Sequence, residues 1–261
     1  MSLFQALLLG TVQGFTEFLP ISSSGHLVLV QHLLHWKGDS LTFDVFLHFG
    51  TLLAVLIALR KELRELALHP FSRLTILLTL STLPTVAIGL LFEKTFESIF
   101  HSGATLGIEF FLTGTLLLYV ESLPPKKVPT LARDMHYQSA FWIGLAQGAA
   151  IFPALSRSGL TLCTALGLGI DRSEAVRYSF LLSVPIILGA SLFKLKNVAA
   201  MHFLLSPALF IGMGSSALTG YLAIRFLLKF IAKASLRPFG VYTILLGVLI
   251  MSDQWIFHRF F

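Results

Sequence analysis

The chain has 261 residues, of which 55% are hydrophobic and only 12% are charged. A soluble domain of this size carries about 25% charged residues, so this composition lacks the polar surface that a cytosolic enzyme needs. The mean hydropathy of +0.82 points the same way. Five windows contain no Asp, Glu, Lys or Arg: 74–92, 135–156, 178–193, 197–224 and 238–252. Because several of them reach the roughly 20 residues that cross a bilayer as a helix, the chain is predicted to be a polytopic membrane protein.

The net charge of +6 does not indicate a nucleic-acid partner. The basic residues stand in short clusters between apolar runs, which is the placement that the positive-inside rule describes. The single cysteine, Cys163, excludes an intramolecular disulfide and any CxxC metal or redox site.

In chain order, the apolar windows predict a broken hairpin over 3–36, spans near 41–59, 74–92 and 104–121, a second broken hairpin over 139–170, and spans near 178–193, 203–224 and 238–252. The breaks read FLPISSSGH and FPALSRSGLT. Irregular backbone at membrane depth is tolerated only where protein or a water-filled cavity surrounds it. The predicted fold is therefore an all-α membrane helical bundle with two re-entrant helix-turn-helix hairpins and six full spans.

The two hairpins resemble each other. Gln-Gly at 13–14 recurs at 147–148, and Ser-x-Ser-Gly at 22–25 recurs at 156–159, in both cases 134 residues later. Chance similarity between two Ser- and Gly-rich breaks is the alternative to a true repeat.

A true repeat divides the single transmembrane domain, 1–261, into halves 1–133 and 134–261 that each hold one hairpin and three spans. An odd number of crossings inverts the second half relative to the first. The segments 60–73, 122–138 and 225–237 are rich in Lys and Arg and are expected in the cytoplasm. The two hairpin tips then approach each other from opposite leaflets. The segment 194–202 is assigned outside although it holds two lysines, which does not fit the rule.

The first hairpin carries an acid where few charges occur. Gln13 and Glu17 stand four residues apart, so on a helix they share one face. An ionisable group inside the membrane is a functional candidate by default. Gln and Glu oxygens facing a wet pocket suit a hard divalent cation such as Mg²⁺ or Ca²⁺. The alternative is a neutral Glu17 that only bonds a neighbouring helix.

The Ser-rich break forms a candidate anion site. Ser22, Ser23, Ser24 and Gly25 lead into His26 and an apolar run that indicates a helix start. Backbone N–H groups and the dipole at such a start favour an anion. Ser23 and His26, three apart, are compatible with a nucleophile and a proton-transfer group. Serine runs at helix starts can also be purely structural.

The second break supplies a positive charge. Arg157 is the only Lys or Arg between positions 133 and 172. It is flanked by Ser156, Ser158, Gly159 and Thr161. A guanidinium can bind phosphate in a bidentate manner, through two parallel hydrogen bonds, and Thr161 can add a hydroxyl one turn later. The alternative is a structural pairing of Arg157 with Glu17 or Glu109. Together the two breaks offer the groups that phosphoryl transfer requires.

Asp44 and Glu109 stand near the outer ends of their predicted spans, where both can reach water, and His48 stands one turn from Asp44, within reach of a hydrogen bond to it. They are placed outside the predicted site.

Residues 13–27 closely resemble the first motif of the undecaprenyl-diphosphate phosphatase family of the bacitracin-resistance type: Glu or Gln, Glu four residues later, a Ser-rich turn and His. The family's second motif, Pro-Gly-x-Ser-Arg-Ser-x-x-Thr, is similar to residues 153–161. Ala154 stands where the family usually has Gly, so a backbone turn that Gly would permit is in question.

The resemblance implies a bacterial inner-membrane enzyme, with its active site open to the periplasm, that hydrolyses undecaprenyl diphosphate to the monophosphate, recycles this lipid carrier for cell-wall synthesis and confers bacitracin resistance. It also implies a divalent cation. The implied roles are metal or acid–base chemistry on Gln13 and Glu17, nucleophilic attack by Ser23, proton transfer by His26, and diphosphate clamping by Arg157 and Thr161. Attack by water with Glu17 as base is an open variant.

The expected partners are a polyprenyl diphosphate and the bilayer. A homodimer is compatible with the sequence but is not required by it. Two rival functions remain. Inverted repeats with broken helices are also typical of transporters, which leaves a lipid-phosphate flippase or anion transporter as the alternative. A purely structural membrane subunit predicts that Glu17→Gln is silent.

Overall fold

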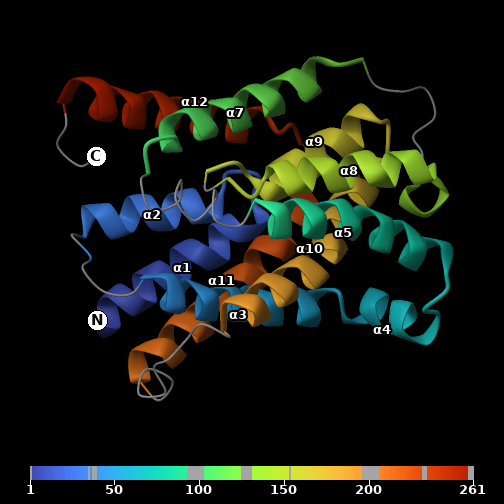
Figure 1. The fold of residues 1–261 in the computed structure, drawn as a ribbon, viewed down its shortest axis with the longest axis horizontal. Helices are drawn as coiled ribbons and strands as arrows, with labels where there is room; N and C mark the ends of the chain where they lie inside the picture. Colours follow the sequence, from blue (N-terminus) through green and yellow to red (C-terminus); the bar gives the residue numbers. More distant parts are fainter. Residues whose placement is uncertain are drawn as a thin grey trace.

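The computed structural model describes residues 2–34, 36, 40–92, 103–124, 131–152, 154–195, 206–230 and 234–257. Every regular element in these ranges is helical (Figure 1). In chain order they are α1 (Leu3–Phe18), α2 (Ser23–Leu33), α3 (Ser40–Ala58), α4 (Arg60–Leu68), α5 (Arg73–Leu91), α7 (Leu106–Ser122), η1 (Ala132–Asp134), α8 (Tyr137–Ala149), α9 (Arg157–Gly167), α10 (Arg172–Leu195), α11 (Pro207–Phe230), α12 (Arg237–Ser252) and the π-helical η3 (Asp253–Phe257). The prediction of an all-α fold is confirmed.

The predicted spans coincide with helices. The two broken segments form the pairs α1–α2 and α8–α9, and the six predicted spans fall on α3, α5, α7, α10, α11 and α12. Among the described residues, α5, α10, α11 and α12 with its extension are long and apolar enough to cross a membrane. A fifth crossing results if α3 and α4, which meet at a bend of 79°, are taken as one span. These helices fit a polytopic membrane protein.

The helix starts at the two breaks follow from their serines. Ser22 caps α2 by accepting a hydrogen bond from the backbone N–H of Gly25 at 3.3 Å. Ser156 caps α9 by accepting one from the N–H of Gly159 at 3.1 Å. A serine that satisfies a free N–H in the first turn ends the irregular segment and begins the helix. The break therefore stops at the same point of the Ser-x-Ser-Gly motif in both hairpins.

Five helix pairs make most of the contacts within the bundle. The helix α1 packs against α11, α8 against α5, and α3 against both α11 and α10. The fifth pair, α7 and α12, forms a layer at one side of the molecule (Figure 1). The contact of α1 with α11 is close enough to require glycine, because a Cβ atom at Gly14 would lie 2.5 Å from the carbonyl oxygen of Ser216. This contact fixes the position of the helix that carries Glu17.

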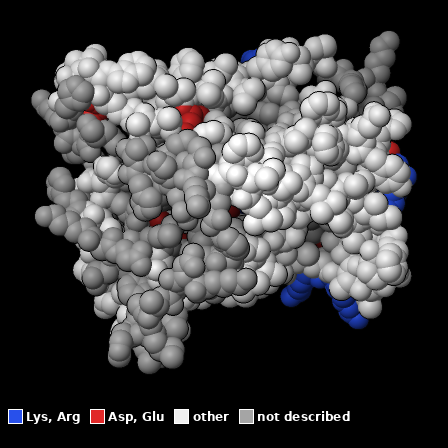
Figure 2. Space-filling view, in the orientation of Figure 1, with Lys and Arg blue, Asp and Glu red and all other residues white. Residues whose placement is uncertain are grey.

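Large apolar side chains cover much of the outside, including Phe4, Leu91, Phe210 and Leu249. Continuous exposed apolar surface marks a partner or a membrane. Figure 2 shows a face with few charges, on which Lys and Arg gather toward the end where α4 lies. The exposed surface thus suits lipid over most of the bundle.

Candidate active site

The two breaks meet inside the bundle. The hydroxyl of Ser158, in the first turn of α9, donates to the carbonyl oxygen of Leu19, just after α1, at 2.9 Å. This bond joins segments that lie 139 residues apart. The predicted meeting of the two Ser-rich breaks is therefore present.

Glu17 is the centre of the site. The side chain is buried, and its Oε1 accepts a hydrogen bond from Nη2 of Arg157 at 2.6 Å. Its Oε2 accepts from the hydroxyl of Ser23 at 2.5 Å and from the amide nitrogen of Gln13 at 3.0 Å. Hydrogen bonds to charged groups are the strong ones, so these three donors compensate a carboxylate that is withdrawn from water. A serine hydroxyl held on a carboxylate is also arranged to lose its proton there.

A histidine that the sequence places outside the site lies beside this carboxylate. Nε2 of His48 is 3.7 Å from Oε2 of Glu17. Its Nδ1 lies 2.7 Å from the carbonyl oxygen of Asp44, which can only accept, so Nδ1 carries the hydrogen and Nε2 faces Glu17. The one-turn spacing of Asp44 and His48 is visible in the sequence, but their approach to Glu17 depends on the packing of α3 beside α1.

His26 lies in another environment. Its Nδ1 is 2.6 Å from the carbonyl oxygen of Ser22, and its Nε2 is 2.7 Å from the hydroxyl of Tyr242 on α12. Ser22 has a φ of 68°, a left-handed conformation that costs a non-glycine residue about 1–3 kcal/mol. In this structure His26 therefore connects the strained turn at Ser22, which directly precedes Ser23, to α12.

The other break is tied to α7. Oε2 of Glu109 accepts a hydrogen bond from the N–H of Ala154 at 2.5 Å, and the hydroxyl of Thr113 accepts one from the N–H of Ser156 at 3.2 Å. Ser22 is the only described non-glycine residue with a positive φ. Ala154, at the position where the family usually has glycine, therefore does not have a positive φ. The preceding proline, Pro153, lies outside the described residues.

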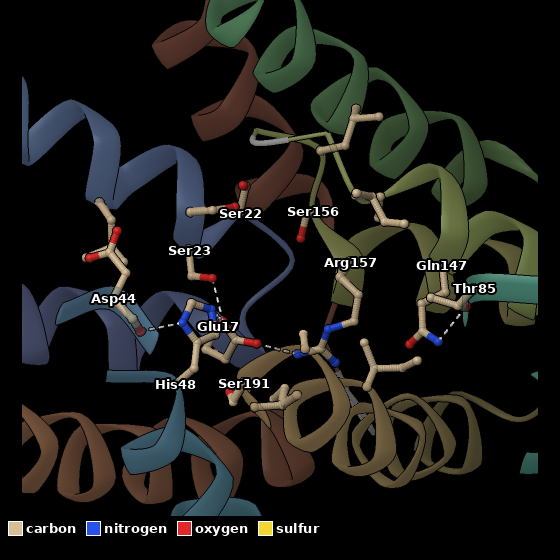
Figure 3. A pocket seen from close by; sticks show the side chains of 18 of the residues that line it. Glu17, Ser22, Ser23, Asp44, His48, Thr85, Gln147, Ser156, Arg157 and Ser191 are labelled. Carbon is tan, nitrogen blue, oxygen red and sulfur yellow. Dashed lines mark hydrogen bonds and ion pairs between the residues drawn. The ribbon is translucent and has the colours of Figure 1, made fainter. Parts of the chain in front are cut away.

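A cavity of about 290 Å³ opens between the two breaks (Figure 3). Its polar wall consists of Glu17, Ser22, Ser23, Ser24, Asp44, His48, Thr85, Gln147, Ser156, Arg157 and Ser191. Its apolar wall consists of Leu27, Val45, Ala150, Ile151, Leu155, Ile186, Ile187 and Ala190. Of the predicted site residues, Glu17, Ser22, Ser23, Ser24, Ser156 and Arg157 line the cavity. The others, Gln13, Gly25, His26, Ser158, Gly159 and Thr161, are not among its lining residues.

Thr161 contacts α10 instead of lining the cavity. Its hydroxyl lies 2.9 Å from the carbonyl oxygen of Arg157 and 2.6 Å from the hydroxyl of Ser179 on α10. The side chain is fully buried. In this structure the hydroxyl holds α9 against α10 behind Arg157.

The residues predicted to bind a cation are not arranged as a cation site. The amide nitrogen of Gln13, not its oxygen, faces Glu17, and both oxygens of Glu17 accept hydrogen bonds. Within the described ranges no group of three or more His, Cys, Asp or Glu residues is placed to hold a metal ion. Gln13 and Glu17 thus do not direct two oxygens at a common point, and the cation stays a prediction.

Comparison with known proteins agrees with the two motifs. The family model described as "Bacitracin resistance protein BacA" matches residues 6–249. A protein of Carboxydothermus hydrogenoformans named undecaprenyl-diphosphatase is 43% identical over 258 residues, which cover 97% of this chain and 98% of the relative. Proteins of Halothermothrix orenii, named undecaprenyl-diphosphatase, and of Bacillus thuringiensis subsp. konkukian, named undecaprenyl-diphosphatase 4, are also 43% identical, over 98% of this chain and 100% and 98% of the relatives. The chain belongs to the BacA bacitracin resistance family.

Proposed function

We propose that the chain is a membrane phosphatase that hydrolyses undecaprenyl diphosphate to undecaprenyl monophosphate and phosphate. The observation that carries this proposal is the contact of Ser23 and Arg157 with the buried Glu17 at a cavity, in a chain whose full-length relatives are named undecaprenyl-diphosphatase. Such an activity returns the lipid carrier to cell-wall synthesis and lowers sensitivity to bacitracin.

In the first step, Oγ of Ser23 attacks the terminal phosphorus and its proton passes to Oε2 of Glu17. The bond between that phosphorus and the bridging oxygen breaks, and the bridging oxygen leaves as part of undecaprenyl monophosphate. The distance of 2.5 Å between Ser23 and Glu17 supports this proton transfer. Nη1 of Arg157 and the N–H groups at the start of α2 and α9 stabilise the charge that develops on the phosphate.

In the second step, water attacks the phosphorus of phosphorylated Ser23, the P–O bond to serine breaks, and phosphate leaves. Glu17 returns its proton to Ser23 in this step, and the phosphate leaves with both protons of the water, as dihydrogen phosphate. The variant in which water attacks the diphosphate directly, with Glu17 as base, needs no covalent intermediate.

His26 and Thr161 take part, in this proposal, by holding the two helix starts. His26 holds the Ser22 turn and Thr161 holds the first turn of α9. Direct proton transfer by His26 would require its Nε2 to release the hydroxyl of Tyr242, which it contacts at 2.7 Å.

We further propose an inverted repeat of halves 1–133 and 134–261, with six spans and two re-entrant hairpins. Two helix contacts support it. Gly10 of α1 packs on Ser215 of α11, and Gly144 of α8 packs on Ser81 of α5. Both partners of the first contact lie 134 residues from their counterparts in the second, which is the offset of the two breaks. The same interhelical contact thus occurs twice, each time between the hairpin of one half and a span of the other half.

The basic end of the bundle, near α4, faces the cytoplasm in this proposal, and the cavity opens to the periplasmic side of the inner membrane. Maleimide labelling of single cysteines introduced at exposed positions of α4 and at the N-terminus of α1, from each side of sealed vesicles, tests this orientation. Labelling of both positions from the same side contradicts it.

The prenyl tail lies against the apolar wall of the cavity, formed in part by Ile151, Ile186 and Ile187. A homodimer is compatible with the proposal but is not required by it, and the proposal includes no nucleic acid.

The family resemblance implies a divalent cation, Mg²⁺ or Ca²⁺, which would neutralise diphosphate charge when bound. Because Gln13 and Glu17 do not direct two oxygens at one point, no step above runs through it. The test is phosphate release after chelation and after return of Mg²⁺. A Gln13→Leu variant with an unchanged Mg²⁺ requirement would exclude this side chain as a ligand, and a raised requirement would support it.

Hydrolysis is separated from transport by assaying protein purified in detergent, where no membrane divides two compartments. Release of phosphate from undecaprenyl diphosphate that is lost in Arg157→Ala supports the enzyme. Binding without phosphate release, together with flux of a lipid phosphate in vesicles, would favour the flippase or anion transporter.

A further inference from the structure

Gln147 presents an oxygen to the cavity in a fixed orientation. The residue lies on α8, its side chain is buried, and its amide nitrogen donates to the hydroxyl oxygen of Thr85 at 3.0 Å. Thr85 has one hydroxyl hydrogen, which it donates to the carbonyl oxygen of Gly144 at 3.0 Å. Thr85 can therefore only accept from Gln147. The amide nitrogen must face Thr85, and Oε1 must face away from it.

This oxygen lacks a hydrogen-bond donor. Oε1 of Gln147 has no partner among the described residues, although Gln147 lines the cavity. Buried acceptors are nearly always satisfied, so an orphaned one calls for a ligand or an ordered water. Figure 3 shows the amide oxygen of Gln147 on the side of the amide that faces Arg157.

Arg157 offers the complementary group. Its Nη2 is bonded to Glu17, but its Nη1 is buried and also without a partner among the described residues. The cavity lining thus includes a buried donor, Nη1 of Arg157, and a buried acceptor, Oε1 of Gln147, that have no partner among the described residues. A ligand that meets both must accept a hydrogen bond from a guanidinium and donate one to an amide oxygen.

A phosphate that retains a proton has these properties. An anionic oxygen accepts from Arg157, and a P–OH group donates to Gln147. A terminal phosphate keeps such a proton in part at neutral pH, since its second pKa is about 6. The inner phosphate of a prenyl diphosphate is substituted on two oxygens and holds no proton there. The ligand is therefore the terminal phosphate, before or after cleavage.

The repeat explains why this part of the cavity accepts a phosphate. Ile151 stands 134 residues after Glu17, at the position in the second hairpin that corresponds to Glu17 in the first. Ile151 lines the cavity as well. Glu17 and Asp44 are the carboxylates among the described lining residues, and Ile151 adds no further charge that would repel phosphate.

We infer that Oε1 of Gln147 and Nη1 of Arg157 form a subsite for the protonated phosphate that is cleaved from the substrate. The identity of the ligand rests on the proposed function, whereas the pair of unsatisfied groups does not. Gln147 is a binding residue in this inference, and Thr85 positions its amide.

The test measures inhibition of hydrolysis by inorganic phosphate, with Gln147→Leu as the main variant. Losing one hydrogen bond should raise the inhibition constant of phosphate about threefold to tenfold. Thr85→Val, which keeps Gln147 but frees its amide, should raise it in the same direction. Gln138→Leu on the exposed part of α8 is the matched control and should leave it unchanged.

The source of the phosphate follows from the kinetic constants. A raised inhibition constant with an unchanged KM identifies the released phosphate as the ligand. A raised KM with an unchanged inhibition constant identifies the terminal phosphate of the bound substrate. If Gln147→Leu and Thr85→Val change neither constant while both remain folded, the subsite does not exist.

A measurement without substrate keeps this inference separate from the proposed function. Inorganic phosphate should raise the Tm of the purified chain, because a ligand that binds the folded state stabilises it. Gln147→Leu should need about threefold to tenfold more phosphate for the same shift in Tm. Equal shifts in Tm together with an unchanged KM would overturn the subsite even if hydrolysis is observed, and unequal shifts would support it even if hydrolysis is not.

Discussion

Replacing Arg157 by alanine should leave the buried negative charge of Glu17 without its guanidinium partner. The Arg157 side chain is 14% exposed and that of Glu17 is 5% exposed, and the guanidinium lies 2.6 Å from the carboxylate. Removing one partner of a buried ion pair costs about 3–5 kcal/mol, because the remaining charge is no longer compensated. Ser23 and Gln13 still donate to Glu17 in this variant, so we expect a loss near the lower end, about 3 kcal/mol.

The double variant Arg157→Ala/Glu17→Gln separates this charge effect from general damage. A neutral amide in place of Glu17 removes the stranded charge, so the double variant should recover more than about half of the lost stability. Chemical unfolding in detergent gives the free energies, and phosphate release is followed in parallel. Both variants should stay inactive, because the double variant lacks the base as well as the clamp. Arg64→Ala, an exposed change on α4, should stay within about 0.5 kcal/mol of the unsubstituted protein.

Two results would refute this reasoning. One is an Arg157→Ala variant as stable as the unsubstituted chain. The other is a double variant that is less stable than the single one. Either would mean that the guanidinium does not hold the carboxylate of Glu17.

The remaining predictions concern helix packing and the role of His26. Gly14→Ala should lower the free energy of unfolding by about 1–3 kcal/mol, because its Cβ would enter the backbone of α11. Gly214→Ala, which has open space around it on α11, should be neutral or raise that energy by up to about 1 kcal/mol; equal effects at the two glycines would contradict the close contact. Tyr242→Phe should cost about 1–3 kcal/mol, because it leaves Nε2 of His26 without a partner. Phosphate release by folded Tyr242→Phe should fall less than about tenfold, since a lost hydrogen bond of this kind is worth about that much; complete loss would show that this hydrogen bond is needed for the chemistry itself.

The helices and the breaks could be predicted because their signals are local. Uncharged apolar windows mark the long helices, and serine before an apolar run marks the starts of α2 and α9. The bend between α3 and α4 was not predicted, because the apolar window simply ends where the charged residues of α4 begin.

The site could be predicted in part. The two breaks identify Glu17, Ser23 and Arg157 because each break is visible on its own. The sequence offers phosphate binding and pairing with Glu17 as alternatives for Arg157, whereas the structure assigns one nitrogen to the ion pair and leaves the other facing the cavity. Charge alone cannot show that one guanidinium can serve both purposes.

Other contacts could not be predicted because they join distant segments. His26 and Tyr242 are 216 residues apart, and no local pattern links them. His48 lies beside Glu17 only because of the packing of α3, and no local pattern in the sequence predicts this contact. Gln147 is visible as the counterpart of Gln13 in the repeat, but its orphaned oxygen depends on the hydrogen bond to Thr85.

The central claim is that this chain cleaves undecaprenyl diphosphate with Ser23, held on Glu17. The most direct measurement is the rate of phosphate release by purified Ser23→Ala, beside the unsubstituted chain and the exposed Ser122→Ala control. Removing a nucleophile typically lowers kcat by about a thousandfold or more, so we predict a loss of that size in Ser23→Ala and none in the control. Turnover by folded Ser23→Ala within about tenfold of the unsubstituted chain would contradict a serine nucleophile and favour direct attack by water.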